Sequence, residues 1–363
     1  MPLGLSGPCE KEGISIKRFA TLKDVAIRAE TTIATASFVL NGAKNRYITP
    51  ELRGRVEKAA RELNYVKHGA ASSLKGEKMG LIAVLSPQYA NPYFLKIFES
   101  IEHVLHKKGY VLATLNTFDD PEREKYAINQ MAKLRVDGFL VIPTIAGGDN
   151  TEHIRKLGLP FVAIERPLNG VEQGKYDFIS SDNLGATYTL TAHALQYGHK
   201  KIALAYWESE ISSNIFNLRD RKTGYINALA EYGLEDSGLI FEGDINRSDG
   251  ESITERILQQ KDITAIVYAH YILAEGGIQL LRKKRVKVPQ DISVLMLGEP
   301  SWMDMAELDF THVVQPGWRV GEQAALVLID KIEKRKKKKM VEIVSADFHK
   351  GTSVLNMAEQ NNV

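Results

Sequence analysis

Short apolar runs alternate with helical patterns along most of this 363-residue chain, and this alternation limits its possible folds more than any other feature. The first runs cover residues 81–85, 110–115 and 138–142, each too short for most helices and separated from the next by helical spacing. Strand, helix, strand in this order predicts a doubly wound parallel sheet. Further runs cover residues 178–181, 202–206, 263–269 and 292–297. Two such sheets fit an α/β core of two lobes with a cleft between them.

A different pattern precedes this core. The stretch from Thr21 to Asn41 reads TLKDVAIRAETTIATASFVLN, which has the layout of a helix-turn-helix. Thr21 and Asp24 form a capping pattern ahead of a short helix with a small apolar face. Thr32 then caps a second helix, for which we expect a common apolar face of Ile33, Ala36 and Leu40.

A third helix is predicted to begin at Thr49-Pro50, because proline suits the first helical position. Three short helices make a small all-α headpiece that could lay its second helix in a major groove. Between Lys17 and Lys78 there are 13 Lys and Arg against 6 Asp and Glu, a formal charge of +7, whereas the whole chain carries +2. This concentration of positive charge favours contact with DNA phosphates over a merely solvated helical face.

The sequence resembles the LacI/GalR family of bacterial transcriptional repressors. The matching segments are TLKDVAIRAE, IATASFVLNG, ITPELRGRVEKAARELNYV and ASSLKGEKMGLIAVLSP, and weaker matches continue to Phe348. The resemblance implies a homodimer that binds a palindromic operator in double-stranded DNA and responds to a small-molecule effector. It also implies a periplasmic-binding-protein-like core in which the chain crosses between the lobes three times.

These expectations divide the chain into four parts. We expect a disordered extension at residues 1–19, the headpiece at 20–65, a hinge at 66–78 and the core at 79–355. The N-lobe is expected at about 79–165 and 310–338, and the C-lobe at about 166–303 and 340–350. The crossings are placed near Glu165 to Pro167, Trp302 to Phe310 and Lys337 to Val341.

The resemblance also assigns DNA contacts. Ile33, Ala34, Phe38 and Arg46 match base-reading positions, and Leu74 matches a leucine that wedges into the minor groove. The remaining expected contacts are Thr21, Thr32, Thr35, Ser37 and Asn41. Core packing for Ile33, helix propensity for Ala34 and a flexible linker at residues 69–76 remain as alternatives.

Two residues depart from the family pattern. Glu30 stands where the family has glycine in the tight turn, and a left-handed conformation there costs about 1 kcal/mol. Phe38 replaces an arginine near the end of the recognition helix. Both changes bear on the tightness of DNA reading more than on the fold.

The effector site is expected in the cleft, beyond the carboxyl ends of the strands. Tyr93 and Phe94 match ring-stacking positions, although Phe94 also fits an apolar helix face. The polar positions are Glu165, Asp182 and Arg221, and His270 and Tyr271 replace an Asn-Asp pair of many relatives. Gly298, Glu299 and Pro300 likewise replace paired acids. An anionic, aromatic or absent effector is therefore favoured over a plain sugar.

Other classes of site find little support in the sequence. The nine histidines show no metal-ligand spacing, and no residues point to a catalytic centre or a cofactor. Cys9 is the single cysteine, no apolar run approaches a membrane span, and residues 1–19 lack a secretory pattern, so we expect a cytoplasmic protein. We interpret the run from Lys334 to Lys339, KRKKKK, as a solvated inter-lobe loop rather than a second nucleic-acid site.

Two other functional hypotheses are compatible with the predicted core. An exported solute-binding protein has the same architecture but no use for a DNA-binding headpiece. An α/β enzyme would need an acid, base or nucleophile converging on the cleft, and Glu165, Asp182 and Arg221 alone do not supply that chemistry.

Overall fold

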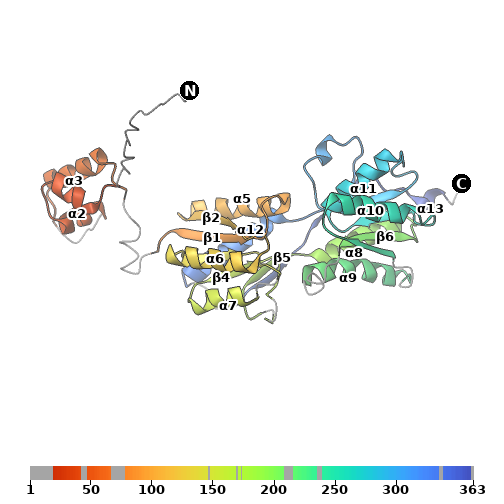
Figure 1. Ribbon diagram of the computed structural model, residues 1–363, viewed down its shortest axis with the longest axis horizontal. Coiled ribbons are helices and arrows are strands. Elements are labelled where there is room, and N and C mark those ends of the chain that lie inside the picture. Colours follow the sequence, from red (N-terminus) through yellow and green to blue (C-terminus); the bar gives the residue numbers. More distant parts are fainter. Residues whose placement is uncertain are drawn as a thin grey trace, which may run out of the picture. The chain divides into compact units, whose positions relative to one another are not determined.

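A computed structural model describes residues 19–41, 47–66, 78–145, 148–168, 171–172, 174–207, 216–234, 239–334 and 338–360. The chain divides into two compact units, Met1–Glu77 and Lys78–Val363, which are described separately below (Figure 1). Cys9, Arg46 and Leu74 lie outside the described residues, as do nearly all of the predicted extension and hinge.

The first unit contains the three predicted helices, α1 (Leu22–Arg28), α2 (Ile33–Leu40) and α3 (Pro50–Glu62). Val25, Ala36 and Val56, one from each helix, are fully buried at the centre of a small apolar core. The predicted face of α2 was partly wrong, because Ile33 is 50% exposed and Val39 is buried instead. Ile33 is the first residue of α2, and its side chain lies outside the apolar core of the headpiece.

Each of these helices begins at a threonine cap. Thr21 forms the predicted capping box with Asp24: the Asp24 N–H donates to Thr21 Oγ1 at 3.3 Å, and the Thr21 N–H donates to Asp24 Oδ2 at 2.7 Å. Thr32 accepts from the Thr35 N–H at 3.1 Å, and Thr49 accepts from the Leu52 N–H at 3.3 Å. These local bonds satisfy amides that have no partner inside a helix.

The second unit contains two six-stranded sheets. The first is parallel throughout, in the order β11-β5-β4-β3-β1-β2. Its strands are β1 (Leu81–Ser86), β2 (Val111–Asn116), β3 (Gly138–Val141), β4 (Phe161–Ile164), β5 (Phe178–Ser181) and β11 (Val341–Val344). Nearly continuous burial of β1, β3 and β5 follows from helices on both faces.

The second sheet has the order β12-β10-β9-β8-β6-β7, with only β12 antiparallel. Its strands are β6 (Ile202–Trp207), β7 (Leu239–Gly243), β8 (Ala265–Tyr268), β9 (Ser293–Leu297), β10 (Thr311–Val314) and β12 (Asp347–His349). The predicted two-lobed α/β fold with doubly wound parallel sheets is thus confirmed.

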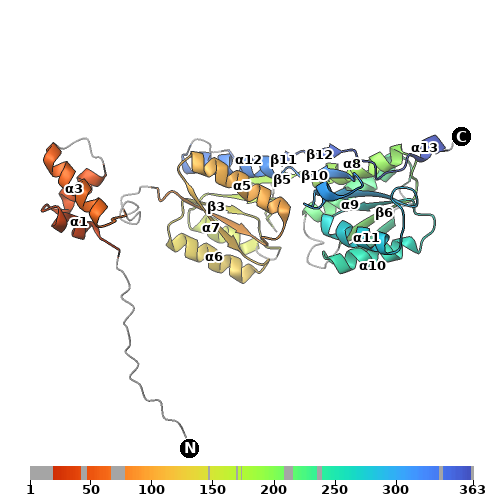
Figure 2. The same cartoon turned by 90° about the horizontal axis from the view of Figure 1, so that it is seen from above.

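Two pairs of helices cover each sheet (Figure 2). In the first lobe, α5 (Pro92–Lys107) and α12 (Gly317–Ile332) lie on one face, and α6 (Pro121–Lys133) and α7 (Gly148–Lys156) on the other. In the second, α8 (Asn183–Gln196) pairs with α9 (Phe216–Glu231), and α10 (Arg247–Leu258) with α11 (Tyr271–Lys283). The helices α10 and α11 cross closely, since Gly276 leaves no room for a Cβ beside the Arg247 carbonyl. The short helices η3 (Met303–Met305) and α13 (Met357–Gln360) complete the second lobe.

The predicted lobe boundaries were wrong at all three crossings. β5 belongs to the first sheet and β10 to the second, so the chain crosses at Asp182, at residues 315–316 and at residues 345–346. The Lys334–Lys339 segment is not inter-lobe, because α12 and β11 on either side of it both belong to the first lobe. Local pattern predicts that a strand exists, but the choice of sheet depends on partners distant in sequence.

Within the described ranges, no helix is both long and apolar enough to cross a membrane.

Candidate functional site

The outer surface of α2 presents side chains that could reach a nucleic acid. Thr32, Ile33, Ala34 and Asn41 are exposed, while Thr35, Ser37 and Phe38 are half-buried. Thr32 and Thr35 share a hydroxyl hydrogen bond of 2.9 Å, and the Asn41 amide donates to Ser37 Oγ at 3.0 Å. The helix has no charged residue, so its readable surface is apolar and hydroxyl-bearing.

Glu30 occupies the turn between α1 and α2 with a φ of 53°, the left-handed conformation that favours glycine. Its carboxylate lies 3.6 Å from the Arg55 guanidinium of α3, and both side chains are well exposed. This ion pair draws the carboxylate towards α3 but is worth little in water. The left-handed conformation expected at Glu30 is confirmed.

In the second unit, side chains from both lobes gather where the parallel strands end. Ser181 is the last residue of β5 and Trp207 the last of β6, while Glu165 follows β4 and His270 follows β8. Tyr93 adds a ring from the first turn of α5. Carboxyl ends of parallel strands lie at one edge of a sheet, so this is where an open α/β sheet binds its ligands.

Glu165 is the centre of the first lobe's polar cluster, although its φ of 60° is again left-handed. The Tyr93 hydroxyl donates to Oε1 at 2.6 Å, as does the Ser181 N–H at 2.8 Å, and the Ser181 hydroxyl donates to Oε2 at 2.9 Å. Burial raises the pKa of Glu165, and these hydrogen bonds oppose the rise. Burial and the nearby carboxylate raise the pKa of Tyr93 well above its ordinary value. The tyrosine therefore acts as a fixed donor.

Arg221 of α9 is the buried cation on the other side. Its Nε donates to Asn183 Oδ1 at 2.7 Å, and its Nη1 donates to the Ala269 carbonyl at 2.7 Å. The Asn183 amide in turn donates to the Ser181 carbonyl at 3.2 Å, which connects Arg221 to the Glu165 cluster. Burial lowers the pKa of Arg221 to about 10, so the side chain still carries its charge at pH 7.

Aromatic rings line the second lobe beside Arg221. The guanidinium lies 5.1 Å from the centre of Trp207, whose ring meets His270 edge-on at 5.3 Å. His270 stacks on Tyr271 at 4.7 Å, and its Nδ1 accepts from the Ile272 N–H at the start of α11. Burial and Arg221 lower the pKa of His270 to about 3, so this ring is a neutral part of the wall.

An ion pair spans the two lobes at the same edge. Lys96 Nζ of α5 lies 2.9 Å from Glu299 Oε2, which follows β9. Tyr93, Tyr271 and Gln315 help to enclose a cavity of about 20 Å³ beside this pair, room for about one water molecule. The lobes are thus closed on each other at this point, with little space for a ligand.

The predicted effector residues do not all meet. Tyr93, Glu165, Arg221, His270 and Tyr271 join the cluster or its aromatic wall. Asp182 instead caps α8, accepting from the Gly185 N–H at 2.8 Å. Phe94 packs into the core beneath α5 and α12, with its ring tilted against Tyr93.

Sequence reasoning missed Ser181, Asn183, Trp207 and the Lys96–Glu299 pair as members of the site. Ser181 and Trp207 end apolar runs, and polar or aromatic residues at the ends of predicted parallel strands are the signal that could have found them. No comparable signal identified Asn183 or Lys96, because both lie within helical patterns and their partners are distant in sequence.

Comparison with known families accounts for both units. Residues 21–68 match the family described as bacterial regulatory proteins, lacI family, and residues 79–352 match the periplasmic binding proteins and sugar binding domain of LacI family. The chain belongs to the LacI family. The resemblance seen in the sequence is confirmed, and with it the prediction of a DNA-binding transcriptional regulator rather than an enzyme.

Curated LacI-family relatives are similar along most of their length. The HTH-type transcriptional repressor PurR of Mannheimia succiniciproducens is 31% identical over 329 residues, which cover 89% of this chain and 96% of that protein. PurR of Aliivibrio salmonicida is 30% identical, with 86% and 92% covered.

Solved LacI-family structures share the architecture. A lac repressor dimer bound to operator and the anti-inducer ONPF has a TM-score of 0.79 at 21% identity, covering 93% of this chain and all of that one. A complex of the regulator CelR with cellobiose has a TM-score of 0.67 at 25% identity, with 92% and 99% covered. The first likeness concerns the fold alone.

Proposed function

We propose that this protein represses transcription by binding a palindromic operator as a homodimer, under the control of a small molecule in the inter-lobe cleft. The observation that carries this proposal is the exposed start of α2, where Ile33 and Ala34 project from a capped helix that is otherwise packed in the headpiece core. Side chains near the start of a recognition helix are the ones that reach base edges. The lac repressor with a similar fold is a dimer bound to operator, and PurR relatives are named repressors.

Specific contacts follow from the chemistry of α2. Ile33 and Ala34 can contact a thymine methyl, which is readable only in the major groove. Thr21, Thr32, Thr35, Ser37 and Asn41 would contact phosphates, because hydroxyls, amides and helix N-termini bind the backbone. Phe38 would add an apolar contact in place of a cation. Guanine reading by Arg46 and a minor-groove wedge at Leu74 remain proposals from the family pattern.

For the effector, we infer a small planar compound, aromatic or conjugated, that carries an acidic group. Trp207, His270 and Tyr271 form a wall of rings on which a planar molecule can stack. Beside it, Arg221 retains its charge and could bind a carboxylate or phosphate through its planar fork. Glu165, the buried carboxylate beside the cleft in the described part of the chain, already accepts from Tyr93 and Ser181, which disfavours its use in binding sugar hydroxyls.

Control would act through the separation of the lobes. Lys96–Glu299 and the pair Arg319–Asp347, at 2.7 Å between α12 and β12, both join the first lobe to the second. A ligand that binds between the lobes and favours a more open arrangement would part these contacts, which shifts the balance between two lobe arrangements. In a dimer, such a shift would change the fit of the paired headpieces to two half-sites.

DNA binding is tested with the purified full chain and DNA from upstream of its own gene, titrated at several salt concentrations. A variant that begins at Met79 and an Ile33→Glu variant are measured beside it. We expect tight, palindrome-selective binding that both variants lose, while Phe19→Ala, an exposed change outside the helices, retains it. Binding of equal strength to random DNA would contradict the proposal.

The effector is sought by thermal shift with three sets of probes: heteroaromatic bases, aromatic carboxylates and neutral hexoses. A carboxylate-bearing planar compound should raise the melting temperature of the wild type and change its operator affinity. Arg221→Lys should weaken the response, because lysine keeps the charge without the fork. A response to neutral hexoses alone would overturn the assignment of the ligand class.

A further inference from the structure

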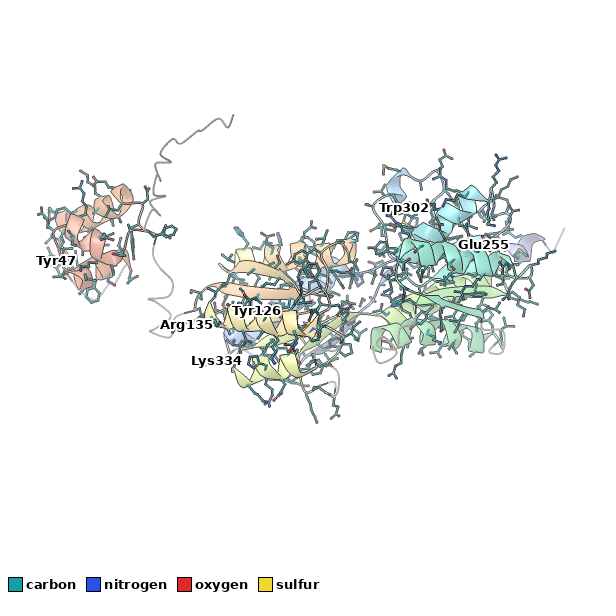
Figure 3. The ribbon with its side chains drawn as sticks, viewed as in Figure 1. Tyr47, Tyr126, Arg135, Glu255, Trp302 and Lys334 are labelled. Carbon is teal, nitrogen blue, oxygen red and sulfur yellow. The ribbon has the colours of Figure 1, made fainter. Side chains whose placement is uncertain are left out.

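The first lobe has a strongly basic edge at the amino-terminal ends of its strands. Six lysines of this edge are exposed and form no ion pair or side-chain hydrogen bond with any other described residue. They are Lys107, Lys108, Lys133, Lys156, Lys334 and Lys338. They come from the ends of α5, α6 and α7 and from the segment between α12 and β11, so they are brought together only by the fold. Figure 3 shows Arg135 and Lys334 at the same end of this lobe.

The acids of this edge are directed inward. Asp137 accepts backbone N–H groups of Met79, Gly80 and Leu81 at 2.6–3.3 Å. Asp177 is buried, 2.9 Å from Lys331 Nζ and 3.4 Å from Lys339 Nζ. These carboxylates hold the start of β1 and the loop before β5 in place, so they do not face the six lysines. Of the other nearby acids, Glu333 lies 4.0 Å from Lys78 Nζ and Glu152 attracts Lys156.

The opposite edge of the same sheet has the contrary charge. Five acids lie at or beyond the carboxyl ends of β2 and β4, only partly balanced by Arg123 and Arg166. They are Asp119, Asp120, Glu122, Glu124 and Glu165. The lobe is therefore polarised along its strands, with its cationic end away from the cleft.

Helix ends alone do not account for the basic edge. Four helices, α5, α6, α7 and α12, end there, and one cation near each C-terminus offsets the helix dipole. Lys331 already supplies the cation in the last turn of α12. The sequence that follows nevertheless contains six consecutive basic residues, 334–339. Like charges this close repel one another, so their concentration costs stability unless an anion is met.

The position of this edge along the chain indicates which anion. Lys78 leads into β1 here, so the polypeptide from the DNA-binding headpiece joins the core at the basic edge. Only residues 67–77 separate Lys78 from Val66, the last described residue of the headpiece. A linker of this length spans at most about 40 Å when fully extended, which limits how far the headpiece and the DNA it binds can lie from Lys78.

We propose that the basic edge of the core binds phosphates of the DNA that flanks the operator, without reading sequence. The inference rests on the proposed operator binding and adds a second contact surface to it. Lysine is a flexible point charge that suits backbone phosphates, and each phosphate neutralised releases counterions. The surface would raise affinity for long DNA and make it more sensitive to salt.

The test uses the full chain carrying Lys108→Gln, Lys133→Gln and Lys334→Gln. The matched control carries Lys200→Gln, Lys261→Gln and Lys287→Gln, three exposed lysines that precede β6, β8 and β9 at the equivalent edge of the second lobe. Each protein is titrated with a duplex limited to two half-sites, about 20 base pairs, and with the same site extended by about 20 base pairs on each side. Thermal melting verifies that both variants fold.

On the extended duplex we expect the basic-edge variant to lose at least about tenfold in affinity and its salt slope to fall by about six, one for each of the three lysines in each of the two subunits. The short duplex and the control variant should show neither change. Equal affinity of wild type and variant for the extended duplex would overturn the proposal and direct attention to an acidic protein partner. An equal loss of affinity on the short and the extended duplex would also overturn the proposal.

A random-sequence long duplex separates this inference from the proposed function. If the wild type shows no operator selectivity, the proposed function fails. Neutralising the basic edge should still weaken binding to long random DNA, because phosphate contacts do not depend on sequence.

Discussion

The headpiece and the cleft of the core place their functional side chains in opposite environments. In the headpiece, Ile33 and Ala34 are exposed and held by a helix whose cap, Thr32, lies one residue away. In the cleft, Glu165 and Arg221 are buried and held by partners from distant parts of the chain. The headpiece surface is positioned by hydrogen bonds between residues close in sequence and suits a large partner. The cleft is positioned by hydrogen bonds between distant residues and suits a small ligand.

The two glutamates with left-handed backbone make the difference concrete. Glu30 and Glu165 have φ angles of 53° and 60°, but Glu30 is exposed beside Arg55, whereas Glu165 is buried and accepts three hydrogen bonds. An exposed ion pair is worth little, whereas a buried carboxylate that loses its role leaves donors without acceptors. The backbone conformation at the two sites is similar, so burial and hydrogen bonding determine how much each side chain contributes to stability.

The largest expected effect is therefore at Glu165. Glu165→Ala should lower the free energy of unfolding of the core by about 3 kcal/mol, because the Tyr93 hydroxyl and Ser181 N–H remain buried without an acceptor. Urea denaturation followed by tryptophan fluorescence measures this, since Trp207, Trp302 and Trp318 all belong to the second unit. The control Glu30→Ala lies in the headpiece, which contains no tryptophan, so its stability is measured by amide hydrogen exchange and should change by less than about 0.5 kcal/mol. Similar losses in both variants would contradict the comparison.

A second prediction concerns pH. Burial raises the pKa of Asp220 from 3.8 to about 6, so the fold favours its protonated form. The resulting stabilisation is present in full below pH 3.8 and is lost as the pH rises through about 6. Asp220→Asn cannot ionise, so it should be more stable than the wild type at pH 7 and no more stable at pH 4. Urea midpoints at both pH values measure this, and an equal shift at both would refute it.

In the headpiece, Thr21→Ala should cost about 1 kcal/mol by removing the capping box of α1. Amide hydrogen exchange on the full chain reads the two units separately, and faster exchange should be confined to α1–α3. Thr223→Ala is the matched control, because its hydroxyl donates to the Arg219 carbonyl inside α9 and caps no helix end. Faster exchange throughout the core after Thr21→Ala would be inconsistent with this local role.

The smallest effect is a gain. Glu30→Gly should stabilise the headpiece by about 0.5–1 kcal/mol, because glycine adopts a positive φ without strain. Glu30→Ala removes the Arg55 ion pair but keeps the strained backbone, so comparing the two variants by hydrogen exchange isolates the backbone term. If Ala and Gly gave equal protection, the ion pair and not the conformation would govern this turn.

Much of the fold followed from short-range pattern. The caps at Thr21 and Thr32 were predicted because a cap and its amide lie within three residues of each other. The start of the third helix at Thr49-Pro50 was predicted because proline suits the first helical position. The strand runs were likewise predicted from short-range pattern. Caps and strand runs are determined by neighbours in sequence, so the sequence shows them. The left-handed turn at Glu30 was expected instead from the resemblance to the LacI family, which has glycine at that position.

The sequence did not determine which distant segments contact each other in the fold. β5 was predicted as a strand but placed in the wrong lobe, and the residues of β10 were placed in the wrong lobe without being predicted as a strand. Nothing local states that Ile179 pairs with Ile164 or that Thr311 pairs with Leu295. Asn183 was missed for the same reason, because its bond to Arg221 spans 38 positions.

By itself, then, the sequence determined a capped three-helix headpiece, a doubly wound core and the family to which they belong. Only the tertiary structure decided which strands share a sheet, that Glu165 and Arg221 join one network, and that lysines from four segments meet at one edge. Local elements depend on backbone geometry and side-chain spacing over a few residues. Burial and charge clustering depend on surfaces that exist only after distant segments have packed.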